Sequence, residues 1–136
     1  MHFTIYFLAL FFVPAFAAPF PQHEPGDFVA VKQKHLGEEK QRAVSVHPAV
    51  VTKKHPDTEE ISVNLISNNY DAPNQEPIGN YYHHPETSDS HLTGKVRFNS
   101  VRVKADVVKI WKNKKGNKQT PMEQADLKRL QEKTSG

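Results

Sequence analysis

The chain contains no cysteine among its 136 residues, so no disulfide can hold its fold together. Small domains often rely on disulfides because their hydrophobic cores are thin. Here burial alone must offset the conformational entropy that folding removes. Leu, Ile, Val and Phe make up 24 of the 119 residues that follow Ala17, close to the level of about 20% below which disorder is expected. We therefore expect a small fold in a chain that is substantially disordered.

The N-terminus has the pattern of a cleaved secretory signal peptide, residues 1–17. Residues 3–13 carry no charge. Small residues follow at Ala15 and Ala17, the positions that signal peptidase reads before a cut after Ala17. A membrane-spanning helix needs about 20 apolar residues, whereas this run ends at Pro14. We expect a secreted, extracellular protein.

Proline, glycine and asparagine divide the rest of the chain. Residues 18–42 combine proline with many charges and predict a flexible arm, in which residues 28–31 are able to form a short strand. Residues 67–94 are rich in turn residues throughout and predict an irregular loop. A structureless loop of that length is unusual in a compact domain. The ordered part is expected within residues 43–136, a small acidic-to-basic region.

Three segments of that region favour strands. Residues 43–52 are interrupted by Pro48, which lacks an amide hydrogen, and predict an edge strand or two short strands. Residues 61–66 alternate apolar and polar side chains, as a half-buried strand does. Residues 95–111 are rich in valine and predict two strands around a bend or bulge at residues 99–100. A helix is the alternative for their end, because residues 107, 110 and 111 share a helical face.

The C-terminal segment predicts a helix over residues 121–133. Thr120 is suited to cap the free amides, Pro121 to occupy the first helical position and Glu123 to complete a capping box. Its apolar face is expected to be thin and to comprise Met122, Ala125, Leu127 and Leu130. The fold class is therefore small α+β, or mostly β with a C-terminal helix.

Charge is distributed unevenly. Residues 18–94 hold six Lys and Arg against eleven Asp and Glu, whereas residues 95–136 hold twelve against four. Such asymmetry is typical of a partner-binding segment. A strand ribbon with one cationic and one apolar face would bind an anionic surface; the alternative is that these side chains form only the solvated face of a small sheet. The candidate contact residues are Lys95, Arg97, Arg102, Lys104, Lys109, Trp111, Lys112, Lys114, Lys115 and Lys118.

Other chemistry is weakly represented. His83, His84 and His91 are weak candidates for metal ligands, because they lack the spacing of a catalytic zinc site and no cysteine is present to complete a structural one. No Gly-x-Ser-x-Gly motif and no glycine-rich phosphate loop occurs. We expect no cofactor and no enzymatic activity.

These observations predict a secreted, non-enzymatic cationic protein. Its expected partner is an anionic membrane or cell surface, or an acidic extracellular protein; export disfavours nucleic acid. In composition the chain is similar to secreted immune peptides of invertebrates and to small secreted effectors of fungi, which implies a role in defence or host–microbe interaction. One alternative is a precursor of a cationic antimicrobial peptide, cut at basic pairs such as Lys114–Lys115. Another is a small secreted hydrolase or hydrolase inhibitor.

Overall fold

The computed structural model describes residues 23–36, 46–68, 73–83 and 92–135. Six strands form one antiparallel sheet in the order β4-β5-β3-β2-β1-β6. This confirms a small, mostly β fold with a C-terminal helix. The elements are β1 (Phe28–Lys32), η1 (Gln33–Leu36), β2 (Val46–His55), β3 (Glu60–Ser67), β4 (Gln75–Pro77), η2 (Ile78–Asn80), β5 (Lys95–Lys104), η4 (Ala105–Val107), β6 (Lys109–Ile110) and α2 (Gln124–Lys133), where η marks a single 3-10 turn.

The expected signal peptide, residues 1–17, lies outside the described residues. Within the described part of the chain, no helix is both long enough and apolar enough to cross a membrane.

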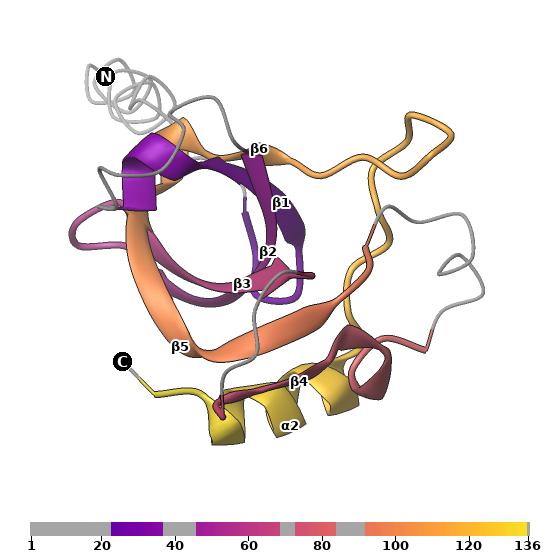
Figure 1. Cartoon of the computed structure of the whole chain (residues 1–136). Helices are drawn as coiled ribbons and strands as arrows, with labels where there is room; N and C mark the ends of the chain where they lie inside the picture. Colours follow the sequence, from indigo (N-terminus) through magenta and orange to yellow (C-terminus); the bar gives the residue numbers. More distant parts are fainter. Residues whose placement is uncertain (1–22, 37–45, 69–72, 84–91, 136) are drawn as a thin grey trace, which may run out of the picture.

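The sheet curls on itself and has an apolar cluster on each face (Figure 1). The inner cluster lies on the concave face and is built from side chains such as Val31, Val51 and Val63, all fully buried. The outer cluster lies between the sheet and α2, and includes Val50 and Leu130. Alternate residues of one strand therefore enter different clusters, which is why the central strands are buried on both faces.

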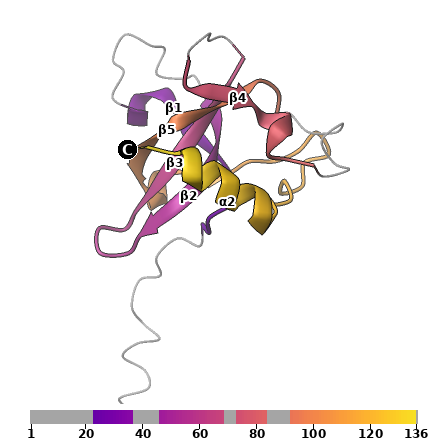
Figure 2. The same cartoon turned by 90° about the horizontal axis from the view of Figure 1, so that it is seen from below.

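Helix α2 lies across the outer face of the sheet (Figure 2). It begins at Gln124, and Glu123 occupies the capping position without a side-chain hydrogen bond. The expected start at residue 121 and the expected capping box are therefore wrong. The backbone of this segment is used in tertiary contacts instead, because Met122 N donates to Gly26 O at 2.9 Å. The end at Lys133 is confirmed, but Ala125 is exposed and does not belong to the buried face.

Strand β2 is one strand that is central in the sheet from Ala49 onward, which corrects the expectation of an edge strand or two short strands except at Pro48 itself. It pairs with β1 on one side and β3 on the other. Pairing with β3 reaches only as far as Ala49, so Pro48 has a neighbour on the β1 side alone. Val51 exchanges backbone hydrogen bonds with the chain at residues 26 and 27. By the alternation of an antiparallel ladder, the nitrogen of Pro48 then faces the unpaired side, where no donor is needed.

The folded unit extends into two segments that were expected to be irregular. In the expected arm, the short strand expected at residues 28–31 is confirmed as β1, which pairs with β2 and β6 and so belongs to the sheet. Within the expected 67–94 loop, β4 pairs with β5, and Tyr81, Tyr82 and Leu92 are buried in the outer cluster. Turn residues are frequent in that loop, but its few large apolar side chains determine its position. Residues 69–72 and 84–91 lie outside the described part.

Strand β5 is one continuous strand rather than two, and η4 and β6 follow it in place of a helix. Its pairing with β3 is irregular between Val96 and Ser100, opposite Ile66 and Asn64, and this confirms the bulge expected at residues 99–100. Val96 joins the outer cluster, whereas Val103 joins the inner one. The start of the strand therefore contacts the outer cluster through even-numbered residues, Val96 and Phe98. Its end contacts the inner cluster through odd-numbered residues, Val101 and Val103.

Candidate anionic-surface site

A group of exposed basic side chains lies on β6 and the turn that follows it. The backbones of Lys112 and Lys118 form an isolated antiparallel β-bridge between the two arms of the turn. Within it, Asn113 N donates to Asn117 O at 2.8 Å, and Gly116 N donates to Asn113 O at 2.9 Å. The side-chain oxygen of Asn113 accepts from the backbone N–H groups of Lys115 at 2.9 Å and Asn117 at 3.1 Å. Gly116 has φ +82°, a conformation that glycine adopts without strain. Local hydrogen bonds therefore hold the turn in one shape.

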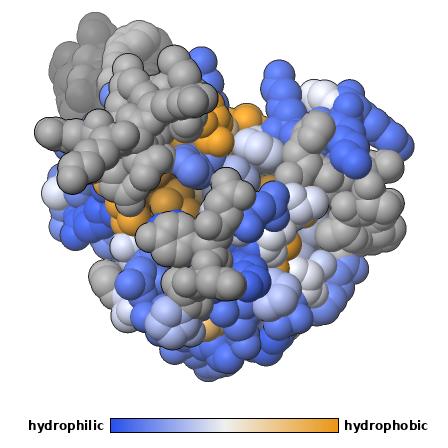
Figure 3. All heavy atoms as spheres, in the orientation of Figure 1, coloured by the Kyte–Doolittle hydropathy of each residue, from blue (hydrophilic) through white to orange (hydrophobic). Residues whose placement is uncertain are grey.

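The stretch Lys109–Lys118, here called the basic turn, presents its lysines to solvent. Lys109, Lys112, Lys114, Lys115 and Lys118 are all exposed. Lys118 lies 3.7 Å from Asp27, whereas the ammonium groups of Lys109, Lys112 and Lys114 have no ion pair within the described part of the chain. Figure 1 shows the turn projecting from the body, and Figure 3 shows hydrophilic side chains at the same place. Ile110, beside these lysines, is 46% exposed.

Trp111 connects the basic turn to the core. Its side chain is half-buried and packs against the outer cluster. Its backbone N–H donates to Phe28 O at 3.0 Å, and its carbonyl accepts from Gln119 N at 3.1 Å. Trp111 therefore fixes the base of the turn.

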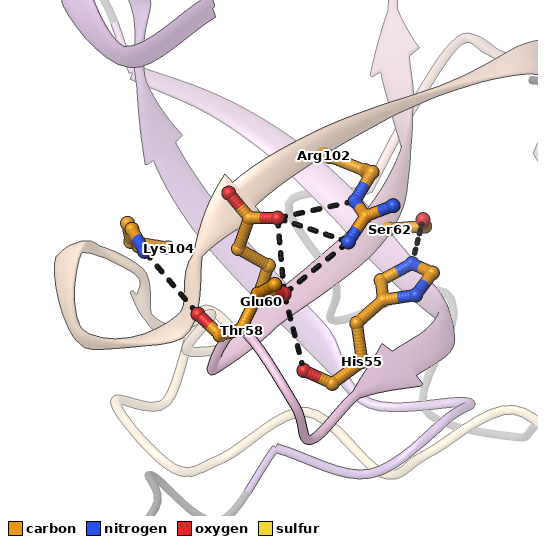
Figure 4. A network of polar contacts seen from close by, with 6 residues as sticks. All are labelled: His55, Thr58, Glu60, Ser62, Arg102 and Lys104. Carbon is orange, nitrogen blue, oxygen red and sulfur yellow. Dashed lines mark hydrogen bonds and ion pairs between the residues drawn. The ribbon is translucent and has the colours of Figure 1, made fainter.

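Arg102 and Lys104 lie elsewhere, on the outer face of β5 against the β2–β3 turn (Figure 4). Arg102 forms an ion pair with Glu60 at 3.0 Å and donates to the hydroxyl of Thr58 at 3.2 Å. Lys104 Nζ donates to Thr58 O at 3.2 Å. Both cations already have partners, and they serve to hold a hairpin end.

Lys95 and Arg97 form a third group, half-buried on β5 beside β4. Lys95 is opposite Ser67 in the ladder, and Arg97 is opposite Gln75. By alternation along the strand they lie on the face opposite to Val96, and hence opposite to Arg102 and Lys104. The expected ribbon with a single cationic face is therefore corrected: the structure brings together only the six candidates of the basic turn.

A histidine and a serine that the sequence did not single out lie together near the β2–β3 turn. His55 Nε2 is 2.7 Å from the hydroxyl oxygen of Ser62, which is itself buried (Figure 4). Burial, and then the positive charges of Arg102 and Lys53, lower the pKa of His55 below 6.5. The neutral ring is therefore favoured near neutral pH. Nothing in the sequence distinguished Ser62 from an outward-facing strand residue, because the pairing that buries it is nonlocal.

The histidines considered as metal ligands divide between described and undescribed regions. His83 lies 3.9 Å from a carboxylate oxygen of Asp126, while His84 and His91 lie outside the described residues. Among those residues that the structure describes, no group of three or more metal-ligating side chains occurs. A weak metal site around His83 stays a prediction.

In comparisons with known proteins, no family model, curated protein or solved structure matched the chain.

Proposed function

We propose that the protein docks on an anionic lipid surface through the basic turn. The observation that carries this proposal is the projection of five exposed lysines around exposed Ile110, three of them without an ion pair among the described residues. The turn keeps its shape through its own hydrogen bonds. Little conformational freedom therefore remains to be lost when it binds, which favours affinity.

Charge supplies most of the expected affinity. Each basic side chain close to an anionic bilayer contributes about 1 kcal/mol, and the contribution falls within a Debye length of about 8 Å at physiological salt. Lys109, Lys112 and Lys114 are the best-suited contacts, because none of their ammonium groups has an ion pair to break within the described part of the chain. Lys118 must weaken its contact with Asp27 to bind, so it contributes less.

Ile110 favours a lipid surface over an acidic protein as the partner. An exposed aliphatic side chain next to lysines suits the boundary between headgroups and acyl chains, where apolar and cationic groups are both stabilised. Burying one such side chain contributes about 1.5–3 kcal/mol. A polyanion without acyl chains offers the charge but no apolar layer for Ile110.

The test compares two double variants of equal charge in the chain from Ala18 onward, with binding to phosphatidylserine-containing vesicles measured by co-sedimentation. Lys112→Gln with Lys114→Gln should weaken binding by about 2 kcal/mol, roughly 30-fold. Lys128→Gln with Lys133→Gln removes the same charge from two exposed lysines of α2, outside the turn, and should have little effect. Equal losses in the two variants would show that only net charge matters and would refute the proposal.

A third variant separates lipid from other anions. Ile110→Ser should weaken binding to the anionic vesicles and leave binding to a soluble polyanion such as heparin unchanged. Neutral phosphatidylcholine vesicles should bind little wild-type protein. If Ile110→Ser binds the anionic vesicles as wild type does, or if heparin competes with full affinity, an acidic macromolecule is the better partner.

The precursor alternative has one specific observation in its favour. The pair Lys114–Lys115 lies exposed on the basic turn, where a protease has access. Lys53 and Lys54 lie within central strand β2, and Arg129 is bound to Asp126 and Asn80. A mass spectrum of the secreted product with a fragment ending at Lys115 would favour the precursor.

A further inference from the structure

A second site lies on the outer face of the sheet, next to the C-terminal end of α2. There an open pocket of about 430 Å³ is lined by polar residues from three strands and the helix end. Sites for small molecules commonly enclose about 300–1,000 Å³. No apolar side chain and no carboxylate is among its lining residues, Thr52, Lys53, Ser62, Ser100, Gln131 and Thr134. The pocket is distinct from the basic turn and shares no residue with it.

An irregularity in β2 shapes the pocket. The pairing of β2 with β3 slips between Val51 and Lys53, so Thr52 is an extra residue opposite β3. Such a bulge locally redirects side chains, and bulges occur often beside functional sites. The carbonyl of Thr52 accepts from Gln131 Nε2 at 2.8 Å. The hydroxyl of Thr52 donates to Asn64 Oδ1 at 3.0 Å. The polar groups of Thr52 thus have hydrogen-bond partners on α2 and β3, and the bulge needs no ligand to keep its shape.

Hydrogen bonds also hold Thr134, which lines the pocket. Asn64 is fully buried and donates to Thr134 Oγ1 at 2.9 Å, and the Thr134 hydroxyl donates to Leu130 O at 2.8 Å. Buried polar side chains are costly unless their hydrogen bonds are made. Burying apolar side chains on a sheet face under a helix costs less free energy than burying polar ones, and Val50 in the outer cluster is such an apolar side chain. Here polar groups line an open, preorganised cavity instead.

The hydrogen-bonding capacity left in the pocket indicates the chemistry of its ligand. Lys53 is exposed, and its ammonium has no ion pair within the described part of the chain. The hydroxyl oxygens of Ser62 and Thr134 keep acceptor capacity beyond their present bonds, and Gln131 keeps one amide hydrogen and its carbonyl oxygen. A complementary ligand therefore carries one anionic group for Lys53 and hydroxyl groups for the remaining acceptors.

We propose that this pocket binds a small hydroxylated anion, of the class of sugar acids and sugar phosphates. Lys53 binds the anionic group, and Ser62, Gln131 and Thr134 bind hydroxyls. Burial, and then the positive charges of Arg102 and Lys53, lower the pKa of His55 next to Ser62, and these two charges agree with an anionic ligand. Together with the proposed function of the basic turn, this site would let the protein bind two kinds of anion, one on a lipid surface and one in solution.

The experiment is a titration of ¹⁵N-labelled chain from Ala18 onward, followed by NMR, with glucuronate, glucose 6-phosphate, glucose and inorganic phosphate as separate probes. The amides of Thr52, Ser62 and Thr134 should shift saturably with one or both hydroxylated anions. Glucose and inorganic phosphate should each bind about tenfold more weakly or worse, because each lacks one half of the recognition. The stronger of the two charged probes identifies carboxylate or phosphate as the anionic group.

Variants assign the binding to this pocket. Lys53→Gln should weaken the charged probes about tenfold or more, whereas Lys128→Gln, a change at another exposed lysine, should not. Lys112→Gln with Lys114→Gln should leave these affinities unchanged, so failure of the surface-docking proposal and failure of this one are distinguishable. Saturation with inorganic phosphate alone at equal affinity, shifts confined to the basic turn, or no saturable shift at millimolar probe would each overturn the proposal.

Discussion

Gly94 provides a quantitative test of how the 67–94 segment is attached to the sheet. Gly94 has φ +107°, and its carbonyl accepts from Ile78 N at 3.0 Å. A Cβ placed there would lie 2.5 Å from the carbonyl oxygen of Ser67 and 2.7 Å from its carbonyl carbon. Backbone atoms of β3 cannot move away as a flexible side chain can. Gly94→Ala therefore combines conformational strain with a steric overlap.

Two other glycines separate these contributions. Gly116 has φ +82°, but a Cβ there would meet nothing within 4 Å. Gly79 has no left-handed φ, and a Cβ there also meets nothing within 4 Å. Left-handed backbone costs a non-glycine residue about 1–2 kcal/mol. Replacing glycine by alanine also restricts the unfolded chain, which stabilises by about 0.4–1 kcal/mol.

The expected order follows from these terms. Gly79→Ala should be neutral or stabilising by up to about 1 kcal/mol. Gly116→Ala should destabilise by about 0.5–1 kcal/mol, the difference between strain and entropy. Gly94→Ala should destabilise by about 2–4 kcal/mol, because forced overlap in a packed site adds about 1–3 kcal/mol. Urea unfolding at equilibrium, with unchanged slope, measures all three. If Gly94→Ala costs no more than Gly116→Ala, the described position of residue 94 against β3 is incorrect.

Two further predictions concern the outer cluster. Leu130→Ala, at a fully buried position of α2, should lower the free energy of unfolding by about 2–5 kcal/mol. Ala125→Ser, on the exposed side of the helix, should change it little. Similar effects of the two variants would contradict the packing of α2 on the sheet. Burial and a hydrogen bond to the carboxylate of Glu76 raise the pKa of Tyr81 from 10 to about 12. Because the unfolded chain then releases this proton first, stability should fall as pH rises from 10 through 12. Tyr81→Phe should remove the part of this loss of stability that comes from Tyr81. Urea unfolding of both proteins at pH 10 and pH 12 measures the difference.

The charge asymmetry of the sequence has a different meaning in the folded protein. The acidic and basic parts do not form separate bodies, because β5 from the basic part lies between β3 and β4 from the acidic part. Specific pairs such as Arg102 with Glu60 and Lys133 with Glu76 cross between them. The composition therefore predicted an excess of cations correctly, but only pairing decides which cations remain unneutralised.

Local sequence determined those features whose causes are local. The alternation at residues 61–66 specifies a strand, since its apolar side chains must share one face. The turn at residues 112–118 follows from Asn113 and Gly116, whose side-chain oxygen and backbone freedom close it without help from elsewhere. Sequence analysis could therefore predict the basic turn of the candidate site. Outside the site, it could also predict the end of α2 at Lys133.

Only the tertiary structure decided the rest, because the deciding contacts join residues far apart in the sequence. Pro48 is tolerated in a central strand because β3 ends its pairing one residue away. Helix α2 starts late because Met122 is bonded to Gly26. The polar pocket arises where a bulge at Thr52 meets the end of α2 through Gln131. Each residue there looks locally like an ordinary surface residue, and long-range pairing alone brings them to one place.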